Sequence, residues 1–444
     1  MGRGDGRAHE ATSMAQAPDQ TATREIPEPT HATSETVRAM GMLLNTVSLY
    51  LHIPFCTAKC HYCDFNSYAG MLGLRERYMD ALEAEILLAG RQARDADRQP
   101  RRCRTIFFGG GTPSLLTTPQ VERLLAASRT AFALDPDAEI TLEANPGAIE
   151  RGRFDELRAA GVNRLSMGAQ SFDAGLLRWM GRIHSADEII EAFRAARAGG
   201  FTNINLDFIF ALPGQTQPIW EQTLERALTL GPDHLSLYNL IVEEGTPLYG
   251  WVARGKVREV DEDTAADMYE HAQRRLETAG YEHYEISNWA RPGRACQHNL
   301  TYWRNLTWIG LGAGGSSYYA HHRFTNARPI RDYIARVRAS LRTPDAPGAP
   351  APLPGGAIVE DEDIGRELEM AETAMLALRL AEGLSLARFA ERFGQPFWPT
   401  FERRLSDISG LGLLEEVDGR VRLSPHGRML GNEVFARLLP DDAD

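Results

Sequence analysis

The chain has 444 residues, of which 43% are hydrophobic and 24% are charged, and its formal net charge is -12. This length predicts a large domain plus a smaller one, with ample apolar content for a core. The acidic balance argues against nucleic acid as the main partner, and no apolar run is long enough for a transmembrane segment. Few cysteines, several of them clustered, suit a reducing cytoplasm, so we expect a cytoplasmic protein.

Residues 1–44 carry small and polar residues, scattered charges and several prolines. They lack the apolar stretch of a signal peptide, and the acids among them argue against a transit peptide. We therefore expect a disordered N-terminal tail. Met40 or Met42, just before the first expected strand, could be the true start.

Three of the five cysteines follow an apolar, strand-like run at residues 47–53. They are Cys56, Cys60 and Cys63, and the C-x3-C-x2-C loop can turn three thiolates toward one point. Thiolates are the ligands of iron–sulfur clusters, which normally have four. The missing fourth ligand would leave one iron of a four-iron cluster open.

Other interpretations of these cysteines remain open on spacing alone. A zinc site would need a fourth ligand, which His52 or His61 could supply. A disulfide would leave an odd thiol. Three buried structural cysteines within eight residues, with Pro54 and Lys59 among them, are the least expected case.

Strands and helices then alternate, which predicts β-α-β units and a parallel sheet over residues 45–250. The expected strands are 47–53, 105–108, 139–144, 163–167, 204–211 and 234–241. The expected helices are 74–92, 119–132, 151–160, 187–198 and 220–230. Six such units can curl into a partial (β/α)6 barrel, in which chemistry gathers at the carboxyl ends of the strands. Unusual residues fall at those ends: the three cysteines, Gly109–Pro113, Glu143, Gln170 and Asp207.

The pattern changes after residue 250. Residues 251–341 read as an extension of the barrel, with a helix at 261–278 and a strand-like run at 281–287. Residues 342–359 are rich in proline and glycine and are expected to be a linker. Residues 360–440 read as three helices and a hairpin with a turn at Asp418-Gly419, which is similar to a winged-helix module. The expected third helix lacks a basic stripe, which disfavours nucleic-acid binding.

The cysteine motif, with Tyr62 just before its last cysteine, is the signature of radical S-adenosylmethionine (SAM) proteins. Its flanks, His-Ile-Pro-Phe-Cys and Cys-Asp-Phe, resemble the branch that holds oxygen-independent coproporphyrinogen III oxidase (HemN) and the heme chaperone HemW. This resemblance covers about residues 47–440. It implies a radical SAM partial barrel, a [4Fe-4S] cluster on Cys56, Cys60 and Cys63, and a HemN-type C-terminal domain at 360–440.

The resemblance also implies one or two SAM sites. Taken singly, each matching residue could be a surface or capping residue, and the glycines a tight turn. As a set they match SAM-binding positions: Tyr50, Tyr62, Gly110, Gly111, Thr112, Glu143, Gln170, Arg182 and Asp207. The glycine segment would bind the amino group of SAM, and Glu143 its ribose hydroxyls.

The run His298-Asn299-Leu-Thr-Tyr302-Trp303 resembles the heme-binding motif of this branch. It implies heme binding by these four named residues, with His298 as the ligand of the heme iron. On physical grounds alone, a single histidine is more often structural. We expect Cys296 to be a small buried residue and Cys103 to be inert.

Two functions follow from the resemblance. The first is a heme chaperone that binds the cluster, SAM and heme and transfers heme to an acceptor protein. The alternative is an oxygen-independent coproporphyrinogen III oxidase of porphyrin biosynthesis. Phe65 stands where HemN-type enzymes carry a fourth cysteine, and those enzymes lack the H-N-x-x-Y-W motif. Both differences favour the chaperone, so we expect no coproporphyrinogen III dehydrogenase activity.

A third candidate function, a winged-helix regulator that senses a cluster, would need a basic recognition helix. Besides the heme acceptor, the candidate partners are an electron donor such as flavodoxin or ferredoxin and a second copy of the chain.

Overall fold

The computed structural model describes residues 46–94, 98–148, 153–342 and 353–440. The expected tail at 1–44, with Met40 and Met42, lies outside these ranges, as does most of the expected linker. None of the helices in the described ranges has the length and apolarity needed to cross a bilayer.

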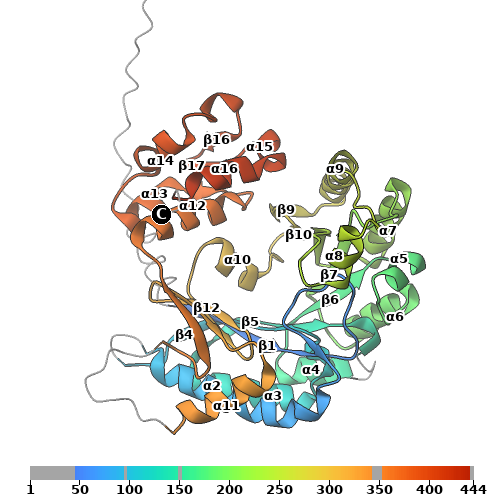
Figure 1. Cartoon of the computed structure of the whole chain (residues 1–444), viewed down its shortest axis with the longest axis vertical. Coiled ribbons are helices and arrows are strands. Elements are labelled where there is room, and N and C mark those ends of the chain that lie inside the picture. Colours follow the sequence, from blue (N-terminus) through green and yellow to red (C-terminus); the bar gives the residue numbers. More distant parts are fainter. Residues whose placement is uncertain (1–45, 95–97, 149–152, 343–352, 441–444) are drawn as a thin grey trace, which may run out of the picture.

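Six parallel strands form the centre of one large sheet, which confirms the partial barrel (Figure 1). In sheet order they are β1 (Thr46–Ile53), β4 (Arg102–Gly110), β5 (Ala133–Ala144), β6 (Arg164–Gln170), β7 (Ile204–Phe210) and β8 (His234–Asn239). Each neighbouring pair is parallel. All six carboxyl ends therefore lie at the same edge of the sheet.

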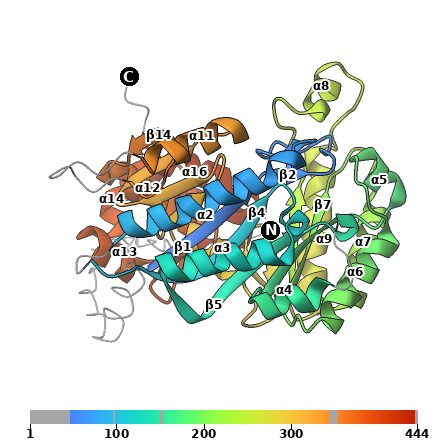
Figure 2. The ribbon, with the colours of Figure 1, turned by 90° about the horizontal axis from the view of Figure 1, so that it is seen from below.

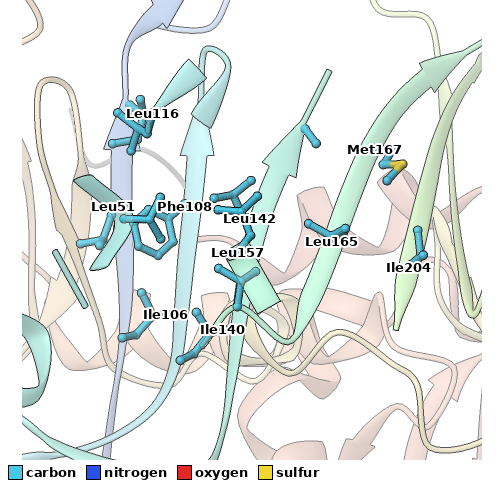
Figure 3. Packing of buried hydrophobic residues seen from close by; sticks show 14 of the residues in the cluster. Leu51, Ile106, Phe108, Leu116, Ile140, Leu142, Leu157, Leu165, Met167 and Ile204 are labelled. Carbon is cyan, nitrogen blue, oxygen red and sulfur yellow. The ribbon is translucent and has the colours of Figure 1, made fainter. Parts of the chain in front are cut away.

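The helices between these strands cover the outer face of the sheet (Figures 1 and 2). They are α2 (Arg75–Gln92), α3 (Thr118–Ala131), α4 (Phe154–Ala160), α5 (Ala174–Trp179), α6 (Ala186–Ala198) and α7 (Gln217–Leu230). Capping boxes at Thr117 and Ser185 fix the starts of α3 and α6. Figure 3 shows Leu51, Phe108 and Leu142 on adjacent strands, where they form part of a continuous buried core.

The sheet does not close, because other strands extend it at both ends. Beyond β8 lie the antiparallel strands β10 (Asn288–Ala290) and β9 (Glu282–Glu285). Beyond β1 lie β11 (Trp308–Leu311), β12 (Ser316–Tyr319), β13 (His322–Asn326) and β14 (Ile358–Asp363). Gly310 allows the turn after β11, since a Cβ there would lie 2.1 Å from the Ser316 carbonyl oxygen.

Further short strands and helices lie around this open sheet. They are β2 (Phe55–Cys56), β3 (Tyr68–Ala69), α8 (Pro247–Ala253), α9 (Glu262–Thr278), α10 (Gln297–Trp303) and α11 (Ile330–Ser340). The sequence patterns predicted α9 and the region of β9, but not α5, α8 or β10–β14. α8 stands apart from the other helices in Figure 2 and its Trp251 ring lies 4.9 Å from that of His61.

The expected linker at 342–359 needs correction at its end, because β14 begins at Ile358 and pairs with β13. The preceding residues also pack on the barrel. Gly356 N–H donates to the buried carboxylate of Glu85, which also accepts hydrogen bonds from Gly312 N–H, the Asn326 amide and the Tyr333 hydroxyl. These contacts could not be predicted from the composition of the segment, because their partners are far apart in the chain.

The C-terminal domain has its own core, centred on phenylalanines such as Phe389 and Phe401. Its elements are α12 (Arg366–Leu378), β15 (Leu384–Ser385), α13 (Leu386–Phe393), α14 (Phe397–Leu405), β16 (Leu414–Val417), β17 (Arg420–Leu423), α15 (Pro425–Met429) and α16 (Gly431–Leu438). Asp418 and Gly419 both have positive φ, which confirms the expected hairpin turn.

α12 connects the two edges of the open sheet. The chain enters α12 from β14 at one edge. After α12, Ala381 N–H donates to the Tyr284 carbonyl, and Leu380 forms a bridge with Glu285 of β9 at the other edge. α10 lies between this domain and the sheet (Figure 1).

Candidate functional site

The cysteine loop begins where β1 ends, at the carboxyl edge of the sheet. Lys59 closes it by donating to the carbonyl oxygens of Phe65 at 2.7 Å and Ser67 at 3.2 Å. Cys56, Cys60 and Cys63 are all free thiols and line one cavity of about 370 Å³. The expected gathering of the three cysteines is therefore present.

Of the two histidines that could have completed a zinc site, His52 has both ring nitrogens occupied and His61 has one. His52 uses its two ring nitrogens for the Asn66 carbonyl and the Tyr50 hydroxyl, and His61 contacts the Trp179 carbonyl. Among the described residues, no three His, Cys, Asp or Glu side chains surround a single-ion position. A four-iron cluster places each thiolate on a different iron, so it does not need such convergence.

Arg182 supplies positive charge beside the cysteine loop. Its Nη1 lies 3.5 Å from Cys60 Sγ, and its Nη2 donates to the Gly168 carbonyl at 2.8 Å. Burial raises the pKa of Tyr62, although the adjacent Arg182 opposes this shift. The Arg182 side chain also lines the cavity, where its positive charge can attract an anionic group of a ligand.

The glycine segment after β4 packs directly on the cysteine loop. Gly111 and Thr112 donate their N–H groups to the carbonyls of Ile53 and Phe55 at 2.9 and 2.8 Å. A Cβ on Gly111 would lie 2.7 Å from the Phe55 oxygen, and Gly110 has φ of 114°. Glycine is required here because the two backbones touch.

Two half-buried carboxylates face the same cavity, Glu143 from the end of β5 and Asp207 from the middle of β7. Burial, followed by repulsion from Asp207, raises the pKa of Glu143 to about 8, while Gly110 N–H and Arg164 oppose the shift. Burial also raises the pKa of Asp207, which accepts a hydrogen bond from Asn205 at 2.7 Å. A cationic ligand carrying hydroxyl groups would stabilise both carboxylates.

Gln170 reaches the cavity through an irregularity in the sheet. The register between β6 and β7 shifts between Gly168 and Gln170, and Gln170 has φ of 64°. Positive φ is uncommon for a residue with a side chain and often marks a functional position. The bulge directs Gln170 toward the cavity that Arg182 also lines.

A smaller cavity of about 140 Å³ lies next to the first, inside the barrel. The two share Glu143, Ser166, Asp207 and Tyr238 in their walls. The expected residues found in the smaller cavity are Tyr50, Glu143, Asp207, His298, Asn299 and Tyr302. Tyr50 thus lies in the smaller cavity, while the other expected SAM residues line the larger one.

His298 lies on α10 and is only 2% exposed. Its Nδ1 contacts Thr105 Oγ1 at 2.7 Å, its Nε2 contacts the Tyr302 hydroxyl at 2.8 Å, and its ring stacks on Phe107 at 5.0 Å. Burial lowers the pKa of His298 to about 3, so the imidazole is neutral. Both ring nitrogens are therefore occupied inside the protein.

This conformation does not fit heme at His298. Pockets for ligands of drug size measure about 300–1,000 Å³, whereas the cavity beside His298 measures about 140 Å³. Asn299 donates to the Tyr284 hydroxyl and Glu285, and Trp303 packs on the Arg379 guanidinium at 4.7 Å. The motif residues hold α10 in place, and the cavity that His298, Asn299 and Tyr302 line is too small for heme.

Several cavity residues were not singled out from the sequence. They are Arg164, Ser166, Asn205, Ser236 and Tyr238, polar residues on β6, β7 and β8. They alternate with buried apolar residues, so a period-two pattern of polar positions could have identified the barrel interior. The remaining cysteines behave as expected: Cys103 and Cys296 are buried, and burial raises the pKa of each thiol to about 12.

Comparison with protein families matches residues 50–227 to the Radical SAM superfamily and residues 366–430 to the HemN C-terminal domain. The chain is 36% identical over 393 residues to Heme chaperone HemW of Bacillus subtilis (strain 168), a match that covers 88% of this chain and 99% of the relative. It is also 36% identical over 398 residues to Heme chaperone HemW of Escherichia coli (strain K12), covering 90% of this chain and 99% of that relative.

Among solved structures, coproporphyrinogen III oxidase (HemN) from Escherichia coli, described as a radical SAM enzyme, matches with a TM-score of 0.74 and 24% identity. The match covers 90% of this chain and 92% of that chain. At this identity the likeness establishes the fold.

Proposed function

The chain belongs to the HemW family of radical SAM proteins, and from this premise we propose that it is a heme chaperone that passes heme to an acceptor protein. The observation that carries the proposal is the convergence of the expected cofactor residues on one cavity. The three cysteines, the glycine segment, Glu143, Gln170, Arg182 and Asp207 line it together.

We propose that Cys56, Cys60 and Cys63 hold a [4Fe-4S] cluster and that SAM binds beside it. The fit rests on three free thiols, the Arg182 guanidinium beside Cys60 and two half-buried carboxylates that suit a cation. When bound, a cluster of this kind supplies electrons one at a time. Glu143 and Asp207 would orient the ligand through its hydroxyl and cationic groups.

The relatives named as heme chaperones support heme as the cargo. In this proposal, the segment His298, Asn299, Tyr302 and Trp303 contributes to heme binding. Direct ligation of the iron by His298 would require its Nε2 to exchange the Tyr302 hydroxyl for iron. We further propose a cytoplasmic location, with flavodoxin or ferredoxin as candidate electron donors and a homodimer as a candidate assembly.

The alternative, coproporphyrinogen III oxidation, is tested in the same experiment. Phe65 is 60% exposed at the cavity, at the position where the alternative would have a fourth cysteine. Protein reconstituted anaerobically with its cluster is titrated with hemin, as wild type and His298→Ala, and is assayed with coproporphyrinogen III. Stoichiometric hemin binding that weakens in the variant, without decarboxylation, is the expected result. Turnover to protoporphyrinogen, with hemin binding indifferent to His298, would refute the chaperone.

A further inference from the structure

A second cavity system lies outside the barrel, between the end of α10 and the C-terminal domain. We call it the arginine cleft, and its enclosed part measures about 90 Å³. Its floor is apolar and consists of Leu306, Ala377, Leu380, Leu384 and Phe389. Its polar wall contains four arginines, Arg304, Arg388, Arg392 and Arg420.

The charges of this cleft are not balanced by its own residues. Arg304 and Arg420 share a single carboxylate, Glu382, at 3.0 and 3.5 Å. Arg392 pairs with Glu369 at 2.7 Å, outside the cleft wall. Arg388 is exposed and has no side-chain hydrogen bond or ion pair with any described residue. With Arg392 neutralised by Glu369, three arginines remain against the single carboxylate of Glu382, in a chain with a net charge of -12.

An apolar floor beside clustered arginines matches one kind of ligand: a flat apolar body with carboxylates at one edge. Guanidinium groups bind carboxylates in a planar, two-pronged geometry. A porphyrin with two propionates has this shape and charge. The cleft space of about 90 Å³ is too small for the macrocycle, so only the propionates would enter it and the ring would lie over the open mouth of the cleft.

We propose that the arginine cleft binds the propionate edge of heme, an inference that rests on the proposed chaperone function. The cleft also explains how α10 contributes without ligating iron. Arg304 directly follows Trp303, whose ring packs on Arg379 of α12, and His298 ties the other end of α10 to Thr105 of β4. His298 and Trp303 are thus positioning residues that hold Arg304 at the cleft.

The experiment uses the full chain with its cluster and compares hemin with hemin dimethyl ester, which lacks both carboxylates. Arg388→Ala and the double variant Arg304→Gln/Arg388→Ala are titrated beside wild type. Arg388 has no partner among the described residues, so its loss leaves the fold intact. Arg403→Ala, an exposed arginine on α14 of the same domain, is the matched control.

We expect Arg388→Ala to weaken hemin binding about three- to tenfold and the double variant to weaken it further, with the control unchanged. Wild type should bind the ester about tenfold more weakly than hemin, and the double variant should bind both equally. If wild type binds hemin and the double variant binds it as tightly, heme binding at the cleft is refuted, whereas the proposed chaperone function is not. Equal binding of hemin and its ester by wild type also overturns the cleft. If wild type binds no hemin at all, the proposed function itself fails.

Discussion

Replacement of His298 should mainly lower the free energy of unfolding, and any loss of heme binding should follow from that destabilisation. In His298→Ala, the hydroxyls of Thr105 and Tyr302 lose their shared partner, and Phe107 loses the stacked ring. Each unpaired buried polar group costs about 1–3 kcal/mol, and truncation of a large buried ring costs about 3–5 kcal/mol overall. We expect a loss of about 3–5 kcal/mol, which lowers the Tm of a chain of this size by about 4–6 °C.

Tyr302→Phe separates the two roles of this histidine. It keeps the imidazole but removes the hydroxyl that contacts Nε2. If His298 is a positioning residue, loss of this hydrogen bond should lower the stability of the protein by about 1 kcal/mol, and hemin binding should weaken slightly. Were His298 the iron ligand, the freed Nε2 would instead bind hemin as well as, or better than, in wild type.

The measurements are thermal unfolding and hemin titration of wild type, His298→Ala and Tyr302→Phe, with the visible spectrum of each complex. We expect the position of the main heme absorption band to be the same in every variant that still binds. A His298→Ala protein with unchanged Tm and a shifted heme spectrum would refute this reasoning, because it would show an imidazole that is free to ligate iron.

Four further outcomes are expected. Cys63→Ala should lower bound iron from about four atoms per chain to near zero, while Cys296→Ala retains it; iron retention in Cys63→Ala would contradict the cluster site. Because the pKa of Glu143 is about 8 in the folded state against an ordinary 4.5, wild type should lose stability relative to Glu143→Gln as pH rises from 4.5 through 8. A melting series over pH tests this, and a widening gap on acidification would disprove it. In Glu85→Gln, the four hydrogen-bond donors around this side chain meet a neutral amide in place of a carboxylate, so Tm should fall by about 2–4 °C. An unchanged Tm would contradict a structural role of Glu85. Gly111→Ala places a Cβ 2.7 Å from a carbonyl oxygen and should weaken SAM binding about tenfold in calorimetry; wild-type affinity would show that this contact is dispensable.

The centre of the fold could be predicted because its signals are local. Each parallel strand is a short apolar run followed by a turn and a helix, and that order alone places the carboxyl ends together. Glu143, Gln170 and Asp207 could be assigned to one site for this reason, and the structure brings them to one cavity.

The remaining parts depend on contacts that no local pattern encodes. β10 to β14 are short strands that exist only because a sheet edge is available to pair with. Gly355 and Gly356 contribute to the composition that suggested a linker. In the structure, their N–H groups donate to the side chains of Gln92 and Glu85 on α2. The role of His298 could not be inferred either, since a histidine that ligates iron and one that bonds two hydroxyls look the same in sequence.

The connection of α12 to both edges of the sheet fixes the width of the barrel's side opening. Its 13 residues give a rigid span of about 20 Å between β14 and β9. Widening the opening would require breaking either the β13–β14 ladder or the contact of Ala381 with Tyr284. Residues 380–385, which make the second contact, continue into the wall of the arginine cleft. A ligand that shifts this wall would therefore strain the contact of Ala381 with Tyr284 and loosen the attachment of α12 to the β9 edge.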